Sequence, residues 1–224
     1  MPEHLPHIAG EDHRGPVRPT ALGAAGAVAA VATRTRVLII SGPSGAGKGT
    51  LIEGVLTGFP ELGLEVAVSA TTRRMRPGER DGEHYHFLAP EEFARRVDAG
   101  EFLEHVTYAG NRYGTLRSEV DRILAAGRSP VVEIELHGAR AVQQSIPGAV
   151  SIFISPPSLE DLVARLSHRG TDTAAEIAAR METSRIELAA RDEFDHAVVN
   201  QDIPRAVADL AAVIRGVLTE AGDG

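Results

Sequence analysis

The sequence lacks several features that would assign a protein to a class at once. None of its 224 residues is cysteine or tryptophan, and aromatic residues make up only 4% of the chain. Without cysteine no disulfide framework can form, so we expect a cytoplasmic protein. Basic residues are outnumbered, with 23 Lys and Arg against 31 Asp and Glu and a net charge of −8. This balance argues against a general nucleic-acid binder, which needs a basic surface, and any anionic ligand must be met by locally clustered cations.

Long hydrophobic runs are also missing. The apolar stretch 21–32 consists mainly of alanine, glycine and valine and is far too short to cross a bilayer as a helix. A signal peptide is the alternative interpretation, but alanine and glycine are only weakly hydrophobic. We therefore expect no membrane partner. Residues 1–33, rich in proline, histidine, glycine and alanine, are expected to form a disordered extension.

The rest of the chain alternates short apolar runs with segments of helical periodicity. Strands are expected at residues 37–41, 64–68, 131–135, 150–154 and 197–199, and two short strand-like pieces are expected in the turn-rich stretch 69–115. Helices are expected at residues 50–58, 90–99 and 137–145, from 158, from 173, and at 207–217. The helix at 90–99 is expected to stop at Gly100, which suits the left-handed conformation of a C-terminal cap. A helix after nearly every strand predicts an α/β fold with a parallel five-stranded core sheet that is covered by helices on both faces.

The segment between the first strand and the first helix predicts a phosphate-binding loop. It reads Gly-Pro-Ser-Gly-Ala-Gly-Lys-Gly-Thr, so the pattern Gly-x-x-x-x-Gly-Lys stands where such a loop requires it. Backbone N–H groups of the loop would form a concave anion site at a helix N-terminus, and the lysine would reach the outer phosphates. The ATP-binding residues expected from this loop are Gly42, Pro43, Ser44, Gly45, Ala46, Gly47, Lys48, Gly49 and Thr50. The loop alone indicates a nucleoside triphosphate, because GTPases, motor ATPases and small-molecule kinases share it.

Gly49 departs from the general pattern, which has Ser or Thr directly after the lysine to contact Mg²⁺. The nearest hydroxyl belongs to Thr50, one residue further along the helix. We expect no direct protein ligand for Mg²⁺, which would be held by the nucleotide and by water, with Thr50 or Glu133 as the candidate residues nearby.

A cluster of cations follows the second expected strand. Arg73, Arg74, Arg76 and Arg80 lie within eight residues of an otherwise acidic chain. The motifs Ser-x-Thr-Thr-Arg-x-x-Arg-x-Gly-Glu (69–79), Gly-x-x-Tyr-x-Phe (82–87) and Tyr-Gly-Thr (113–115) occur there in order. Together they closely resemble the guanylate kinase family, and the resemblance runs from about residue 37 to residue 200. It implies a P-loop nucleoside monophosphate kinase fold, with a GMP-binding lobe and a lid, that transfers the γ-phosphoryl group of ATP to GMP.

The resemblance also implies roles for individual residues. Arg73, Arg76, Tyr85 and Tyr113 match ligands of the acceptor phosphate. Glu104 matches the carboxylate that reads guanine, and Ser69 and Thr115 match hydroxyl groups near the guanine carbonyl. Glu135 stands where the family has Asp near the guanine amino group, and Asn200 matches a position near the adenine of ATP. Arg169 and Arg180 match the catalytic lid arginines, and Arg165 lies near them; a surface ion pair with Asp172 or Glu176 is the alternative.

The chemistry of the base supports the assignment of Glu104. Guanine presents N1–H and an exocyclic amino group side by side, and these two donors suit the two oxygens of a carboxylate. Adenine has a lone pair at N1, so the same carboxylate would reject it. Because Glu133 and Glu135 alternate with Val132 and Ile134, we expect both carboxylates on one side of a strand, near its C-terminal end.

The expected domain organisation follows from these motifs. A guanylate kinase-like domain would span 34–220, with its core at 34–68 and 116–220, the GMP-binding lobe at 69–115 and the lid at about 165–185. Two alternatives stay open: a related kinase for another phosphorylated acceptor, such as a ribose bisphosphate, and a non-catalytic interaction module. His84 and His86 could share a strand face as a metal pair, but without a third ligand a structural role is favoured. The sequence does not indicate an oligomeric state.

Overall fold

The core sheet is built around β1, Leu38–Ser41, a strand whose four residues are all buried. A computed structural model describes residues 35–108, 110–162 and 174–219, with side chains from residue 181 onward in the last range. The expected extension at 1–33 lies outside these residues. The five strands run parallel in the order β2-β7-β1-β8-β9. Their bounds are Leu64–Val66 for β2, Ser129–Glu133 for β7, Val150–Ser155 for β8 and His196–Val199 for β9.

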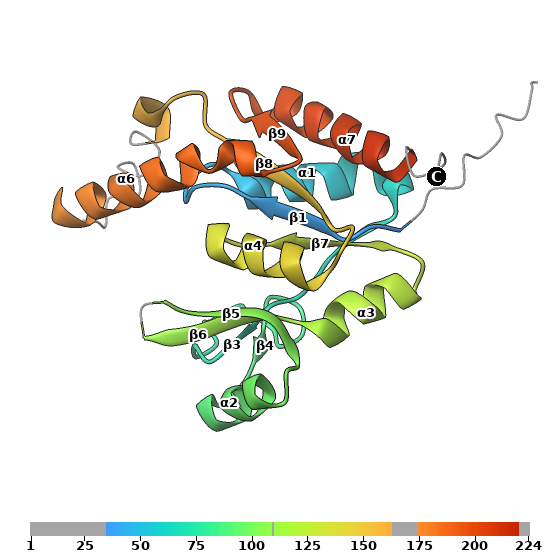
Figure 1. The fold of residues 1–224 in the computed structure, drawn as a ribbon, viewed down its shortest axis with the longest axis vertical. Helices are drawn as coiled ribbons and strands as arrows, with labels where there is room; N and C mark the ends of the chain where they lie inside the picture. The colour runs from blue at the N-terminus through green and yellow to red at the C-terminus, as the bar shows by residue number, and fades with distance from the viewer. Residues whose placement is uncertain (1–34, 109, 163–173, 220–224) are drawn as a thin grey trace, which may run out of the picture. The chain divides into compact units, whose positions relative to one another are not determined.

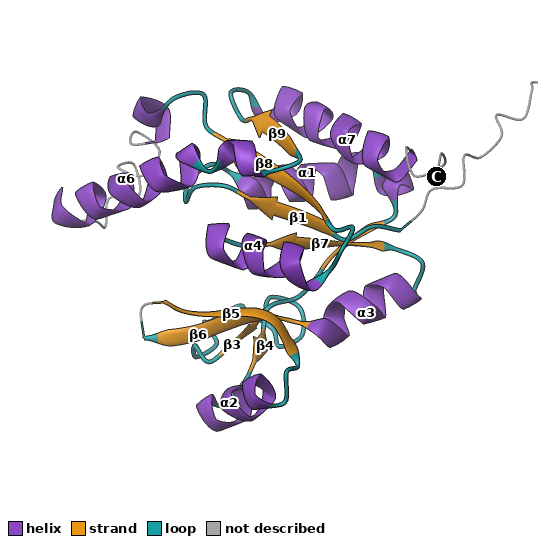
Figure 2. Ribbon diagram, viewed as in Figure 1, coloured by secondary structure: helices purple, strands orange, loops and turns teal. Residues whose placement is uncertain are grey.

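Helices cover both faces of this sheet (Figures 1 and 2). They are α1 (Lys48–Gly58) and α7 (Ile203–Thr219) on one face and α3 (Arg117–Ala125) and α4 (Leu136–Ser145) on the other. A further helix, α6 (Ala174–Ala189), extends beyond the carboxyl ends of the strands (Figure 1). Alternate residues of β1 divide between two hydrophobic cores, because successive side chains of a strand point to opposite faces. Leu38 and Ile40 pack with α1 and α7, and Ile39 packs with α3 and α4. The predicted α/β fold with a parallel five-stranded sheet is confirmed.

A second sheet is formed by residues between 70 and 116. Its strands are β3 (Ala70–Thr71), β4 (His86–Phe87), β5 (Phe102–Tyr108) and β6 (Asn111–Leu116), in the order β4-β3-β6-β5. The helix α2, Pro90–Asp98, packs on it through the buried ring of Phe93, which stacks on Phe102. The left-handed conformation expected for Gly100 after this helix is confirmed, with φ of 69°. Only two short strand-like pieces were expected between 69 and 115, whereas the structure has four strands there.

Several expected element bounds are corrected. The strand β2 ends at Val66 rather than at residue 68, and α1 begins at Lys48 rather than at residue 50. The helix expected from Ser158 is present, and the Ser158 hydroxyl accepts a hydrogen bond from the Asp161 backbone N–H at 3.0 Å. Short 3₁₀ helices occupy Pro60–Leu62 and Arg191–Glu193. Among the described residues no helix has the length and apolar character needed to cross a membrane.

The carboxyl ends of the parallel strands meet at one edge of the core sheet. Gly42 follows β1 and Asn200 follows β9, while β7 ends on Glu133 itself. Ligands of parallel α/β sheets bind outside this edge, so the fold brings three predicted site residues to one place.

Candidate active site

The phosphate loop between β1 and α1 depends on glycine at two positions where backbone or side-chain atoms approach closely. Gly42 has φ of 143°, and a Cβ built there would lie 2.1 Å from the carbonyl oxygen of Ile154 on β8. Gly47 has φ of 88° at the N-cap of α1, and a Cβ there would lie 2.4 Å from Nδ2 of Asn200. Any other residue at either position would strain the backbone and displace a neighbour. The loop is therefore held as a backbone cradle at a helix N-terminus.

Lys48, the first residue of α1, is the only lysine in the sequence. Its Nζ donates hydrogen bonds to the carbonyl oxygens of Gly42 at 2.7 Å and Pro43 at 3.3 Å. Burial lowers the pKa of Lys48, and the nearby carboxylate of Glu133 opposes that shift. The ammonium thus lies inside the loop, at the place where the outer phosphates of a nucleotide would need a mobile charge.

Asn200 braces the loop from the end of β9. It is only 3% exposed, and its Nδ2 donates to the carbonyl oxygen of Ala46 at 2.7 Å. A cavity of about 520 Å³ opens beside it. The residues that line this cavity are Gly45, Gly47, Thr50, Asn200, Gln201, Asp202, Ile203 and Pro204. The predicted adenine contact of Asn200 stays a prediction, but the residue lies between the loop and this cavity.

Glu187 is a site residue that the sequence did not indicate. Its carboxylate, on α6, accepts a hydrogen bond from the backbone N–H of Ser44 in the loop. Burial raises the pKa of Glu187, while the positive charge of Lys48 acts in the opposite direction. No motif marks this position, since a glutamate in an amphipathic helix has no distinctive local pattern. Only the packing of α6 on the loop reveals it.

Glu133 provides the carboxylate nearest the loop lysine. A Cβ built on Gly49 would lie 3.6 Å from Oε2 of Glu133, so the missing side chain leaves this carboxylate beside the first turn of α1. Burial raises the pKa of Glu133 and the charge of Lys48 lowers it. The described residues contain no group of three His, Cys, Asp or Glu side chains that could hold a metal ion. A single carboxylate beside a phosphate cradle suits Mg²⁺, which retains most of its water and is bound largely by nucleotide phosphates.

Glu135 differs from expectation. We expected Glu133 and Glu135 to alternate along one strand, but β7 ends at Glu133 and that prediction is wrong. Glu135 is instead the N-cap of α4, where Oε2 accepts from the backbone N–H of His137 at 2.8 Å and Oε1 from that of Gly138 at 2.7 Å. A capping carboxylate satisfies helix N–H groups that have no partner within the helix, and this terminates the strand. Each oxygen retains a free lone pair, so the predicted guanine contact stays a prediction.

Three of the four residues predicted to bind the acceptor phosphate lie together on the second sheet. The guanidinium of Arg73 lies 5.4 Å from the ring centre of Tyr85 and donates a hydrogen bond to the hydroxyl of Tyr113. The rings of Tyr85 and Tyr113 meet edge to face, with centres 6.1 Å apart. Burial raises the pKa of Tyr85, so this phenol stays protonated and can donate to an anion.

Glu79 holds this cationic group in place. Its two oxygens accept from Arg73 at 2.8 and 3.0 Å, and the backbone N–H of Arg76 donates to it at 2.7 Å. These contacts lower the pKa of Glu79 to about 2, chiefly through the hydrogen bond from Arg73. The fourth predicted phosphate ligand, Arg76, is exposed at the surface next to Glu79.

Two of the residues predicted to lie at the guanine base, Glu104 and Thr115, face each other across the hairpin of β5 and β6. Glu104 pairs with Thr115, and the Thr115 hydroxyl donates to Oε1 of Glu104 at 2.8 Å. A bulge between Phe102 and Glu104 sets this pairing. It sends Phe102 into the core of the second sheet and Leu103 into the core beneath α3 and α4. Burial raises the pKa of Glu104, the hydrogen bond from Thr115 opposes that shift, and Glu135 adds to it.

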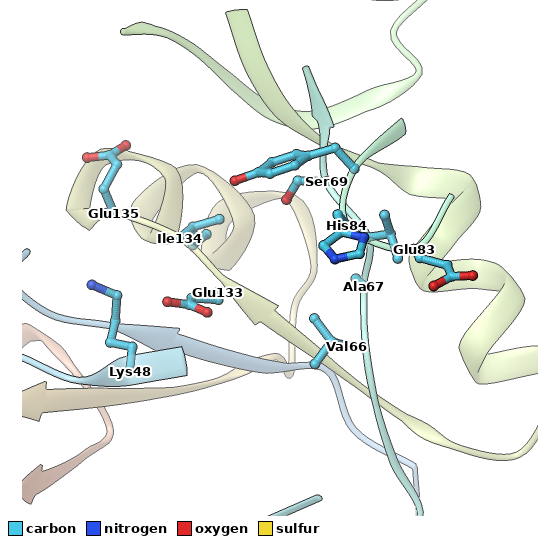
Figure 3. Close-up of a pocket in the computed structure, with 11 residues that line it drawn as sticks. Lys48, Val66, Ala67, Ser69, Glu83, His84, Glu133, Ile134 and Glu135 are labelled. Carbon is cyan, nitrogen blue, oxygen red and sulfur yellow. The ribbon is translucent and has the colours of Figure 1, made fainter. Parts of the chain in front are cut away.

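One cavity joins the two halves of the site (Figure 3). It has a volume of about 460 Å³ and opens between the phosphate loop and the second sheet. Its lining residues are Lys48, Val66, Ala67, Val68, Ser69, Glu83, His84, Tyr85, Glu133, Ile134 and Glu135. A second cavity of about 400 Å³ lies between β5 and α4, and Glu135 borders both. Glu104 lines the second cavity.

The remaining predicted residues divide into two groups. Arg165 and Arg169 lie outside the described residues, and of Arg180 only the backbone position on α6 is described. His84 and His86 do not face a common metal site among the described residues. Nδ1 of His84 accepts from the backbone N–H of Arg80 at 3.1 Å, and Nε2 of His86 lies 3.4 Å from Oε1 of Glu119.

Comparisons with known proteins identify the family of this chain. Residues 34–217 match the family model described as guanylate kinase. A guanylate kinase from Frankia casuarinae is 50% identical over 178 residues, which cover 80% of this chain and 96% of that protein. A guanylate kinase from Rubrobacter xylanophilus is 46% identical, over 83% of this chain and 96% of that protein. The crystal structure of guanylate kinase from Anaplasma phagocytophilum superposes with a TM-score of 0.65 at 29% identity, covering 84% of this chain and 89% of that one. The chain belongs to the guanylate kinase family.

Proposed function

We propose that this protein is an ATP:GMP phosphotransferase, which moves the γ-phosphoryl group of ATP to GMP to give ADP and GDP and so acts in purine nucleotide metabolism. One observation carries the proposal. The cavity of about 460 Å³ is lined by Lys48 from the phosphate loop on one side and by Ser69 and Tyr85 from the second sheet on the other. A donor and an acceptor phosphate bound in this cavity would meet without crossing solvent.

ATP is assigned to the phosphate loop. The backbone N–H groups of residues 42–50 would hold the phosphates, and the cavity beside Asn200 would take the rest of the nucleotide. Nζ of Lys48 would leave the carbonyl oxygens of Gly42 and Pro43 to bind the outer phosphates. Mg²⁺ bound to ATP would neutralise phosphate charge, and the Glu133 carboxylate is positioned to hold it through water.

GMP is assigned to the second sheet, which we propose as the GMP-binding lobe. Arg73, Tyr85 and Tyr113 would bind its phosphate, with Arg76 joining from the surface. Glu104 would accept hydrogen bonds from N1–H and the amino group of guanine, with Thr115 holding the carboxylate. dGMP lacks only a ribose hydroxyl that none of these contacts uses, so it should also be accepted.

The chemical step needs positioning and charge neutralisation more than proton transfer. A phosphate monoester has a second pKa of about 6 and is mostly dianionic at neutral pH. An oxygen of the GMP phosphate can therefore attack the γ-phosphorus without a general base, as the bond to the β–γ bridging oxygen breaks and ADP leaves. Lys48 would stabilise the charge that develops, and we propose that Arg169 and Arg180 close over the transferring group as lid arginines.

A coupled assay of ADP release tests this proposal. With ATP and Mg²⁺, turnover is expected with GMP and dGMP and not with AMP, UMP or phosphorylated sugars. Activity with a phosphorylated sugar instead of GMP would favour the alternative acceptor. A correctly folded protein that shows no GMP-dependent turnover would contradict the main proposal. If it also bound GMP without turnover, the non-catalytic interaction module would be favoured.

A further inference from the structure

The first turn of α4 meets the side chain of Glu104 at a position where the helix has no side chain of its own. Gly138 is the third residue of α4 and is buried. A Cβ built on Gly138 would lie 3.1 Å from Oε2, 3.3 Å from Cδ and 3.4 Å from Cγ of Glu104. Three consecutive atoms of the glutamate therefore crowd the place where any other residue would carry its Cβ.

Neither conformation nor helix stability accounts for a glycine here. The backbone of Gly138 is not in the left-handed region, where glycine is favoured. Glycine is also among the least favourable residues within a helix. The space taken by Glu104 is the remaining physical reason for its presence.

Fixed contacts on both sides define where the glutamate lies. Glu135 caps the same turn through the backbone N–H groups of His137 and Gly138, at 2.8 and 2.7 Å, so the turn itself is anchored. On the opposite side the hydroxyl of Thr115, a fully buried residue, donates to Oε1 of Glu104 at 2.8 Å. The carboxylate is confined between α4 and β6. A Cβ on Gly138 would push it toward Thr115 or break its hydrogen bond with the Thr115 hydroxyl.

We infer that Gly138 is a specificity-determining position, which sets the preference for guanine by leaving room for the Glu104 carboxylate. The inference rests on the proposed function, because it assumes that Glu104 reads the base. A carboxylate that accepts two parallel hydrogen bonds must be held to within about 0.5 Å of its productive position. A displacement of a few tenths of an ångström weakens the bond to the guanine amino group and the bond to N1–H unequally. Gly138 acts through Glu104 and is a positioning residue.

The test compares GMP with inosine monophosphate, whose base keeps N1–H but lacks the amino group. In Gly138→Ala, kcat/KM for GMP should fall about tenfold, and the ratio of kcat/KM for GMP to that for inosine monophosphate should fall at least about threefold. KM for ATP should not change. A purely structural effect would lower the values for both acceptors equally and leave the ratio unchanged, and that result would overturn the inference.

Gly58→Ala is the matched control. Gly58 ends α1, a Cβ added there would meet no atom within 4 Å outside its own neighbourhood, and its φ is ordinary, so neither acceptor should be affected. The wild-type protein tests the proposed function separately. If wild type turns over GMP but Gly138→Ala keeps the wild-type ratio, only the inference about Gly138 fails. If wild type does not use GMP, the proposed function fails first.

A double-mutant cycle tests whether Gly138 acts through Glu104. In a Glu104→Ala background the carboxylate is gone, so Gly138→Ala should cause no further loss of GMP activity. Additive losses would overturn the inference. The cycle also covers a folding defect. If Gly138→Ala alone does not fold, adding Glu104→Ala should restore folding, because it removes the clash. If the double variant also fails to fold, another group fills the space beside Gly138 and the inference is overturned.

Discussion

The phosphate loop and the second sheet, the proposed donor and acceptor sites, are built in opposite ways. The loop is a single stretch of nine residues whose anion site is made of backbone, and glycines at 42 and 47 allow β8 and Asn200 to approach it. The second sheet collects side chains from separate strands and turns, held by contacts such as those of Arg73 with Glu79 and of Thr115 with Glu104. A backbone site recognises the phosphates common to all nucleoside triphosphates, whereas a side-chain site can discriminate among acceptors. A substitution that disturbs the phosphate loop should therefore impair ATP binding as a whole. A substitution in the second sheet should impair only the contact that its own side chain makes with GMP.

The largest difference between the effects on turnover and on GMP binding is expected for Lys48→Ala. Turnover should fall by roughly 10³-fold, because the variant loses the charge that stabilises the developing phosphate charge. GMP affinity, measured by equilibrium dialysis, should change by less than about twofold. Lys48 is the only lysine in the chain, so an amine-directed reagent modifies it and the N-terminus alone, and ATP should protect it. Equal loss of GMP binding and turnover would contradict the division.

Arg73→Ala should affect the acceptor half alone. The variant loses a charged contact to the GMP phosphate, and it leaves the Glu79 carboxylate without its main partner. We expect kcat/KM for GMP to fall about 10²-fold while KM for ATP stays within about twofold of wild type. Arg95→Ala serves as the control, since Arg95 lies on α2 of the same lobe and pairs with Glu92 at the surface. A matching rise in KM for ATP would show that the two regions are not separable.

Thr115→Val should change the pH dependence of GMP use. Glu104 must be ionised to accept from guanine, and its pKa is already raised by burial, so GMP binding weakens as the pH falls through that pKa. The Thr115 hydroxyl opposes this shift. Removing it should raise the pKa further and move the acidic limb of kcat/KM for GMP to higher pH. Ionisation of GMP itself is the same for both proteins, so the difference reports on Glu104, and superimposable profiles would contradict its assigned role.

Glu79→Gln should produce the smallest effect, which we expect to see in the pH dependence of stability. The folded pKa of Glu79 lies at about 2, below its ordinary value of 4.5. Its contribution is therefore present above about pH 4.5 and is lost as the pH falls toward 2. Thermal unfolding should show wild type more stable than the variant at neutral pH, with the gap closing across that window. The control is Glu83→Gln, which removes an exposed ion pair with Arg80 and should show a smaller stability difference from wild type. If the stability difference between wild type and Glu79→Gln persisted at about pH 2, the low pKa assigned to Glu79 would be contradicted.

Much of the fold could be predicted because the core sheet is encoded locally. The runs at 37–41 and 150–154 are continuous and apolar, and both became strands with fully buried centres. The second sheet was largely missed for a physical reason. β3 and β4 have two residues each, which is too short for any periodicity, and most of β5 is exposed and polar. Such strands are defined by partners that lie far away in the sequence.

Site residues that belong to a contiguous motif could be predicted from the sequence. Site residues whose role depends on contacts with distant segments could not. The loop around Lys48 was identified from its spacing alone, while the roles assigned to Arg73 and Glu104 came from resemblance to the family. The alternation of Glu133 and Glu135 with apolar residues predicts a strand up to residue 135. The strand ends two residues earlier, at Glu133, because Glu135 caps α4. Glu187 and Gly138 carried no local signal, because their importance arises from the packing of α6 and α4 against other segments.

The bulge in β5 has a consequence for how this lobe can evolve. Of three consecutive residues, Phe102 enters the core of the second sheet, Leu103 enters the core beneath α3 and α4, and Glu104 enters the proposed base site. The environment of each of these residues therefore depends on the register of β5 against β6. Sliding β5 by one residue against β6 would place Leu103 or His105 opposite Thr115, and each of the three environments would receive the wrong side chain. Single-residue insertions or deletions in this strand should therefore be rarer among functional variants than substitutions, and base preference depends on residue count as well as residue identity.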